Sequence, residues 1–175
     1  MIKTYITFGI FLLLISSCAI QNKDKEQKRR PTAEDLISIN RRMVSLDADA
    51  IKVYVEENNL QMKETKTGLW YHIDSEGEGD LAVKGDVVEL SFEITLLDGT
   101  ACYSSDSLGN KRFKVGQGGV EPGLEEGILL LNKGAKATFI MPPHRAHGLV
   151  GDDDKIPGRK SIIYKVEVVD IKRES

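Results

Sequence analysis

The chain of 175 residues has few cysteine, histidine and aromatic residues, the side chains on which many enzyme active sites depend. It contains two cysteines, Cys18 and Cys102, and three histidines, and aromatic residues make up 6% of it. Basic residues gather only in a short run at 23–30, which argues against a DNA or RNA partner. With 29% charged residues, 41% apolar residues and a formal net charge of −3, the composition is that of an ordinary globular domain.

The sequence also lacks an apolar run long enough to cross a bilayer as a helix, which takes about 20 residues. The longest run, Ile6–Ile15, follows Lys3 and precedes Ser16-Ser17-Cys18, the pattern of a secretory signal peptide over residues 1–17. The segment ending at Cys18 resembles a bacterial lipobox, which implies that Cys18 carries acyl chains such as palmitate. The alternative is an ordinary signal peptide followed by a coincidental cysteine.

Residues 18–31 are polar and without apolar periodicity, so we predict a flexible tether. An amphipathic helix is predicted over 32–60, because Thr32 and Asp35 form a capping-box-like start. Its apolar residues recur at steps of three and four in one stripe: Leu36, Ile39, Met43, Leu46, Ala50 and Val53. We expect this stripe to pack on the chain's own domain. The alternative is a homodimer or partner interface through residues 32–58.

The second half of the chain alternates between strand patterns and turn signals. Strands are predicted at 67–73, 88–94, 137–141 and 162–168, with a turn at Asp98-Gly99. A short helix is predicted over Gly123–Lys133, ending at Gly134. Several strands around one short helix indicate the α+β class, with an antiparallel sheet packed against the helix.

The stretch MPPHRAHGLV at 141–150 holds two of the three histidines, His144 and His147. Pro142-Pro143 argue against a helix that would bring both imidazoles to one face. A pair of histidines without a third nitrogen or sulfur ligand is a weak zinc signal. The carboxylates at 152–154 stand in a row rather than at alternate positions, so we interpret them as a solvated loop tip. We therefore predict neither a metal nor a cofactor.

Four segments in fixed order carry a family resemblance: KGDVVELSFEITLLDGT, FKVGQGGVEPGLEEGILLLNKGAKATFIMP, AHG and IPGRKSIIYKVEVVDI. Together they resemble FKBP-type peptidyl-prolyl cis-trans isomerases over about residues 83–173. The resemblance implies an FKBP-like curved antiparallel sheet wrapped on a short helix, in a domain over 66–175. The signal, tether and long helix resemble the gliding-motility-associated FKBP lipoproteins of Bacteroidetes. This implies a lipid-anchored protein of the cell envelope, on the outer membrane and facing the periplasm.

The resemblance also implies a substrate pocket. The positions that correspond to the family's pocket are Phe92, Tyr103, Phe113, Val120, Glu121, Leu124, His147, Ile156 and Tyr164. In the family, the position of Ile156 presents its backbone N–H to a substrate carbonyl. Tyr103 stands where the family has an aspartate, Leu124 where it has a tryptophan, and His147 where it has a tyrosine. Glu121 replaces an aliphatic residue, and Lys111 replaces an aromatic one.

The implied reaction is rotation about an Xaa-Pro bond, with a barrier of about 18–20 kcal/mol. A twisted amide is less polar than a planar one, so an apolar pocket favours it without a nucleophile or metal. The implied partners are proline-containing segments of exported proteins. The altered pocket leaves two other interpretations open: a proline-directed binding or chaperone module with little turnover, and an assembly component of an envelope machine.

Overall fold

The computed structural model describes residues 30–173, so the predicted signal peptide, Cys18 and most of the tether lie outside the described residues. Residues 30–36 and 37–173 fall in two separate compact units. Helix α1 (Ala33–Glu57) begins in the first and continues into the second. The predicted capping box is confirmed: the Thr32 N–H donates to Asp35 Oδ2 at 2.9 Å, and the Asp35 N–H donates to Thr32 Oγ1 at 3.2 Å. Between residues 30 and 173, none of the helices has the length and apolar character that crossing a membrane requires.

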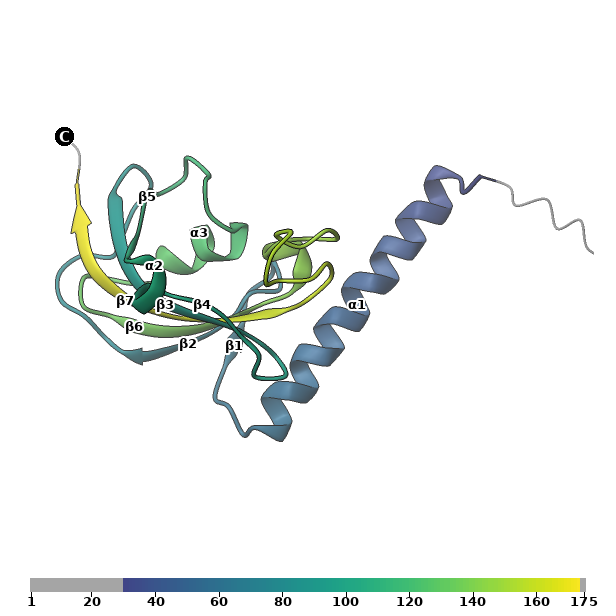
Figure 1. The fold of residues 1–175 in the computed structure, drawn as a ribbon, viewed down its shortest axis with the longest axis horizontal. Coiled ribbons are helices and arrows are strands. Elements are labelled where there is room, and N and C mark those ends of the chain that lie inside the picture. Colours follow the sequence, from purple (N-terminus) through teal and green to yellow (C-terminus); the bar gives the residue numbers. More distant parts are fainter. Residues whose placement is uncertain (1–29, 174–175) are drawn as a thin grey trace, which may run out of the picture. The chain divides into compact units, whose positions relative to one another are not determined.

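The second unit is built on one antiparallel sheet of seven strands (Figure 1), and the predicted α+β fold is confirmed. The strands follow the order β1-β2-β6-β7-β3-β4, and β5 pairs with the first half of β3. Their bounds are β1 Lys63–Glu64, β2 Trp70–Ser75, β3 Val87–Leu96, β4 Ala101–Ser104, β5 Lys111–Lys114, β6 Lys136–Met141 and β7 Ile162–Lys172. Strand β2 starts later than the predicted 67, because Thr65–Gly68 forms a turn in which Gly68 has φ +88°.

Three short helical segments complete this unit: α2 Ser105–Leu108, α3 Pro122–Ile128 and the 3-10 turn η1 Pro143–Arg145. The sheet curves around α3 (Figure 1). The prediction that α3 reaches Lys133 is wrong. The Leu130 and Leu131 N–H groups bond to carbonyls three residues back, and the Leu131 carbonyl accepts the Ala82 N–H at 2.8 Å. Because this bond ties the chain after Ile128 to residues 78–82, α3 ends at Ile128. Gly134 therefore follows a turn and does not cap the helix.

The core lies between the sheet and α3. The alternating residues of β3, namely Val88, Leu90, Phe92 and Ile94, are all buried, as the period-two pattern predicts. Their partners on β7 alternate in the same way, and Leu124 and Ile128 of α3 are fully buried against them. Cys102 is buried in this core and forms no disulfide within the part of the chain that the structure describes. The strand ends around α3 therefore define where side chains can form a pocket.

Helix α1 packs on the sheet through a different face from the predicted one. Ile51 and Val55 are buried with Ile140 of β6 and Ile163 of β7. An ion pair of 2.8 Å between Asp47 and Arg159 adds to this contact. The predicted stripe residues Ile39, Leu46 and Val53 are 49%, 54% and 51% exposed. The expectation that this stripe packs on the chain's own domain is thus wrong, because residues four apart on the neighbouring face make that contact.

Candidate functional site

An apolar cavity of about 210 Å³ opens where β3, β4, α2 and β5 meet the residue before α3 and the loop after η1. It is lined by Phe92, Ile94, Tyr103, Leu108, Lys111, Glu121 and His147. Four of the predicted pocket residues are therefore brought together here. A second hollow, of about 420 Å³, shares Lys111, Glu121 and His147 with it and adds Val120. The two form one candidate site, apolar on one side and charged on the other.

The charged side is a cluster of three residues, Lys111, Glu121 and His147, which we call the charged cluster. Glu121 is buried, with its side chain 7% exposed, and its two carboxylate oxygens face two different cations. Oε2 lies 3.5 Å from Lys111 Nζ, and Oε1 lies 3.3 Å from His147 Nε2. The latter is an ion-pair contact rather than an aligned hydrogen bond, because the Nε2 atom has no hydrogen-bond partner among residues 30–173.

The charged cluster changes the protonation of its own members. Burial by itself raises the pKa of Glu121, but His147 and Lys111 outweigh burial and hold this pKa below its usual value. The Glu121 carboxylate in turn raises the pKa of His147, against the lowering effect of burial. His147 is therefore protonated to a higher pH than an isolated histidine.

The Lys111 ammonium also covers the aromatic part of the site. Its Nζ lies 5.3 Å from the ring centroid of Phe92 and 5.4 Å from that of Tyr164. The two rings are themselves 5.7 Å apart and tilted by 45°. This is the geometry of a cation–π contact with both rings. Tyr164 is fully buried, and its hydroxyl has no hydrogen-bond partner within residues 30–173.

Tyr103 holds the loop after η1 in place. Its hydroxyl donates to Asp152 Oδ2 at 2.5 Å, and this bond raises the pKa of Tyr103 to about 12. Asp152 Oδ1 also accepts the N–H of Ile156 at 2.8 Å. The interpretation of 152–154 as a solvated loop tip is therefore wrong for Asp152, which organises the loop from inside. The implied contact between the Ile156 N–H and a substrate carbonyl is not available in this structure, because that N–H is already bonded.

Four predicted pocket residues do not line either hollow. Phe113, Leu124, Ile156 and Tyr164 are all buried in the core, at 8% exposed or less, behind the residues that do. Ile94 and Leu108 line the cavity but were not predicted to. The alternation of β3 gave a signal for Ile94, which follows Phe92 on the same face. Leu108 is the single apolar residue of its turn, and no pattern marks it.

The two histidines of the 141–150 stretch have different surroundings. Met141 ends β6, and the 3-10 turn η1 covers only Pro143–Arg145, so no helix extends from His144 to His147. His144 is exposed, with Nε2 3.2 Å from the Thr67 carbonyl oxygen, while His147 lies at the site. Across residues 30–173 no group of three histidine, cysteine, aspartate or glutamate side chains is placed to hold a metal ion.

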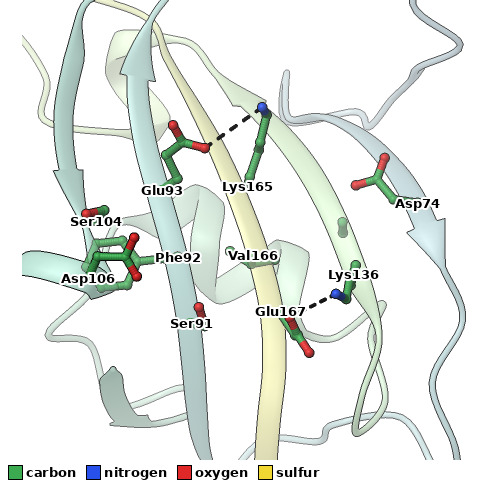
Figure 2. Close-up of a pocket in the computed structure, with 11 residues that line it drawn as sticks. Asp74, Ser91, Phe92, Glu93, Ser104, Asp106, Lys136, Lys165, Val166 and Glu167 are labelled. Atoms are coloured by element: carbon green, nitrogen blue, oxygen red, sulfur yellow. Dashed lines mark ion pairs between the residues drawn. The ribbon is translucent and has the colours of Figure 1, made fainter. Parts of the chain in front are cut away.

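A larger hollow, of about 510 Å³, lies on the outer face of the sheet (Figure 2). Most of its lining comes from β3, β6 and β7, and Asp74 of β2, Ser104 of β4 and Asp106 of α2 add to it. Figure 2 shows two ion pairs across it: Lys165 with Glu93 at 3.9 Å, and Lys136 with Glu167 at 3.1 Å. These charged side chains are about half exposed or more, so the surface offers no dry, apolar surroundings for a prolyl ring.

Comparison with known proteins gives one family. The model of FKBP-type peptidyl-prolyl cis-trans isomerases matches residues 79–169. The chain is 36% identical, over 123 residues, to a probable FKBP-type peptidyl-prolyl cis-trans isomerase FkpA of Neisseria meningitidis, covering 69% of this chain and 44% of that protein. It is 31% identical to the FKBP-type 22 kDa peptidyl-prolyl cis-trans isomerase of Escherichia coli, covering 74% of this chain and 63% of that protein. The chain thus spans less than two thirds of the length of these curated relatives.

Solved structures agree with this result. The crystal structure of FkpA from Escherichia coli has a TM-score of 0.62 and 29% identity, covering 81% of this chain and 68% of that one. The crystal structure of AtFKBP13 has a TM-score of 0.61 and 26% identity, covering 63% of this chain and 98% of that one. The FKBP-like fold extends over the described sheet and α3.

Proposed function

The chain belongs to the FKBP-type peptidyl-prolyl cis-trans isomerase family, and from this premise we propose that it accelerates Xaa-Pro isomerisation in exported proteins. The single observation that carries the proposal is the apolar cavity beside Glu121. Phe92, Ile94 and Leu108 give it surroundings in which a twisted, less polar amide is favoured over a planar one. A metal or a covalent intermediate is not needed for this reaction.

The start of α3 is held at the edge of the cavity by its own backbone. The Glu121 carbonyl accepts the N–H groups of Leu124 and Glu125 at 2.9 and 3.0 Å. The Glu121 N–H bonds to the carboxylate of the same residue and thereby lowers the pKa of that carboxylate. A substrate carbonyl would therefore compete with the Glu121 carboxylate for this N–H.

An assay on short Xaa-Pro peptides tests the proposal. We expect the native chain to accelerate exchange above the thermal rate, and Leu108→Asp to lower kcat/KM by about tenfold, because a carboxylate is costly beside an apolar cavity. Leu108 is 65% exposed, so its replacement should leave the fold intact. Leu81→Asp is the matched control, since Leu81 is 48% exposed and lines neither hollow. No acceleration by native protein at micromolar concentration would refute the proposal.

A second candidate function is a proline-directed binding or chaperone module with little turnover. The observation that favours it is the Lys111 ammonium above Phe92 and Tyr164, where a prolyl ring would compete with it. The same peptides distinguish the two functions. Micromolar binding without acceleration supports the module, and acceleration by the native chain excludes it.

We also propose that the protein is a lipoprotein of the cell envelope, of the gliding-motility-associated type, held on the outer membrane. The apolar run Ile6–Ile15 followed by Ser16-Ser17-Cys18 supports this. We expect the full chain to incorporate labelled palmitate in a bacterial host and to sediment with membranes. Cys18→Ala should lose the label, and the matched control Cys102→Ala should keep it. Equal labelling of both variants would exclude acylation at Cys18.

The exposed stripe of α1 supports a homodimer or partner interface, as part of a folding or assembly role. Ile39, Leu46 and Val53 are each about half exposed at helical spacing, although all three are large apolar residues. We expect Leu46→Asp to lower the mass measured by sedimentation of the soluble chain, while the unfolding free energy changes by less than about 0.5 kcal/mol. Ser45→Asp, one residue away, is the control that should change neither. A native chain that sediments as a monomer would contradict the homodimer.

A further inference from the structure

Lys111 forms part of the surface that a prolyl ring would contact. It lines both hollows of the site, and its Nζ is nearly equidistant from the Phe92 and Tyr164 rings. The side chain is 27% exposed, so it lies at the border between the cavity and solvent. A proline that packs against Phe92 therefore lies next to an ammonium group. The residues flanking that proline come within the reach of the flexible lysine side chain, because neighbouring Cα atoms are about 3.8 Å apart.

The charge on Lys111 is only partly neutralised by the protein while His147 is protonated. Glu121 is the carboxylate that pairs with it, and the same carboxylate also faces His147. When His147 is protonated, the charged cluster holds two positive charges and one negative charge, so it has a net charge of +1. When His147 is neutral, Lys111 and Glu121 balance each other.

The other charged groups near the site are occupied elsewhere. Asp152 also faces His147, but its oxygens accept the Tyr103 hydroxyl and the Ile156 N–H. Asp154 accepts the same hydroxyl at 3.1 Å. Lys155 lies over the Tyr103 ring, with Nζ 5.2 Å from its centroid. Among residues 30–173, Lys111 is thus the cation that both lines the cavity and contacts the Phe92 and Tyr164 rings.

We propose that Lys111 is a specificity-determining residue, which makes the site prefer prolines preceded by a glutamate or aspartate. This inference rests on the proposed function. The substrate carboxylate draws the Lys111 ammonium away from the rings and forms an ion pair with it, and the prolyl ring takes the vacated place against Phe92. Both steps favour the same substrate, because a neutral neighbour would leave the ammonium in competition with the proline.

Four peptides that differ only in the residue before proline test this inference: glutamate, glutamine, leucine and lysine. The assay measures kcat/KM for each peptide. Fluorescence anisotropy gives Kd as well, so that a preference among the peptides is detected even if none of them is isomerised. At pH 6 we expect the glutamate peptide to exceed the glutamine peptide by about fivefold, and the lysine peptide to fall below it. The ratio should shrink as pH rises through the raised pKa of His147, because a neutral imidazole no longer shares the Glu121 carboxylate with Lys111.

Variants assign the preference to Lys111. Lys111→Met, which keeps the length and removes the charge, should bring the glutamate-to-glutamine ratio to about one, and Lys111→Arg should restore it. Lys165→Met is the matched control, because Lys165 is 65% exposed on the outer face of the sheet and should leave the ratio unchanged. His147→Gln should abolish the pH dependence of the ratio.

The outcomes separate this inference from the proposed function. If no peptide is accelerated but binding still favours glutamate, the enzyme proposal fails and the specificity assignment stands. If all four peptides are accelerated or bound equally, or if Lys111→Met keeps the preference, the specificity assignment is overturned.

Discussion

Replacing Gly151 with alanine should lower the free energy of unfolding by about 4 kcal/mol, because the new side chain meets two separate obstacles. Gly151 has φ +82°, a conformation that L-residues rarely adopt. A Cβ atom there would also lie 2.2 Å from the Ile156 carbonyl oxygen and 2.8 Å from the Gly158 nitrogen. Both contacts are with backbone, so no side-chain rotation relieves them.

The loss should also reach the candidate site. Gly151 pairs with Pro157 in an isolated bridge, and Asp152 exchanges hydrogen bonds with Ile156 inside the same loop. Opening this loop removes the acceptor of the Tyr103 hydroxyl and frees the segment that carries His147. We therefore expect Gly151→Ala to lose peptide binding together with stability, as measured by urea unfolding and fluorescence anisotropy.

Gly148 provides the matched control in the same loop. It has φ +68°, but a Cβ atom there would meet nothing within 4 Å. Gly148→Ala should cost only the backbone strain, about 1 kcal/mol. Equal losses of unfolding free energy for the two variants would contradict this prediction. They would mean that backbone strain accounts for the whole effect, and that the loop moves without cost to relieve the contact between the new Cβ atom and the Ile156 carbonyl.

The strands were predictable because each has one face in the core. In β3 and β7 the alternation of apolar and polar residues corresponds directly to burial. The end of α3 was not predictable from its own residues. Leu129, Leu130 and Leu131 continue the apolar pattern, but the Leu131 carbonyl bonds to Ala82, about fifty positions earlier in the chain. A contact so distant in sequence overrides local propensity.

The packing face of α1 was missed for a related reason. Two apolar faces lie side by side on this helix, and periodicity alone does not say which one the domain covers. A signal did exist in the strands: Ile140 and Ile163 are apolar at positions where alternation predicts solvent. The structure shows both of them buried against Ile51 and Val55. Apolar residues on the outer face of two neighbouring strands thus indicate where a helix covers the sheet.

The candidate site was predictable as a set of positions but not as a set of contacts. Lys111, Glu121 and His147 were each recognisable as departures from the family. Their pairing depends on how β5, the start of α3 and the loop after η1 meet in space, which no local pattern specifies. The same holds for Asp152, whose bonds to Tyr103 and Ile156 depend on the turn at Gly151.

Removing the charge of Glu121 should destabilise the protein by about 2 kcal/mol at pH 5.5, and by clearly less at pH 8.5. The carboxylate is buried, so its loss leaves Lys111 and His147 without their shared partner. A fully buried pair broken in this way costs about 3–5 kcal/mol. Both cations here are about a quarter exposed, so solvent compensates part of the loss.

The direction of the pH dependence follows from the two pKa shifts. The pKa of His147 is raised in the folded state, so its contribution is fully present below about pH 6.5 and is lost as pH rises through the folded pKa. The pKa of Glu121 is lowered, so its contribution is present above about pH 4.3 and is lost as pH falls through the folded pKa. The charged cluster therefore stabilises most between these limits, where all three members are charged.

Urea unfolding of native protein, Glu121→Gln and His147→Gln at pH 5.5 and 8.5 measures this coupling. At pH 5.5, Glu121→Gln should lose more stability than at pH 8.5, because the stabilisation that protonated His147 gains from Glu121 is lost as pH rises through its raised pKa. In the His147→Gln background, the cost of Glu121→Gln should be the same at both pH values, because Lys111 alone remains. A cost in the native background that does not change with pH would show that His147 does not titrate against Glu121, and that the imidazole acts in the site only through its shape.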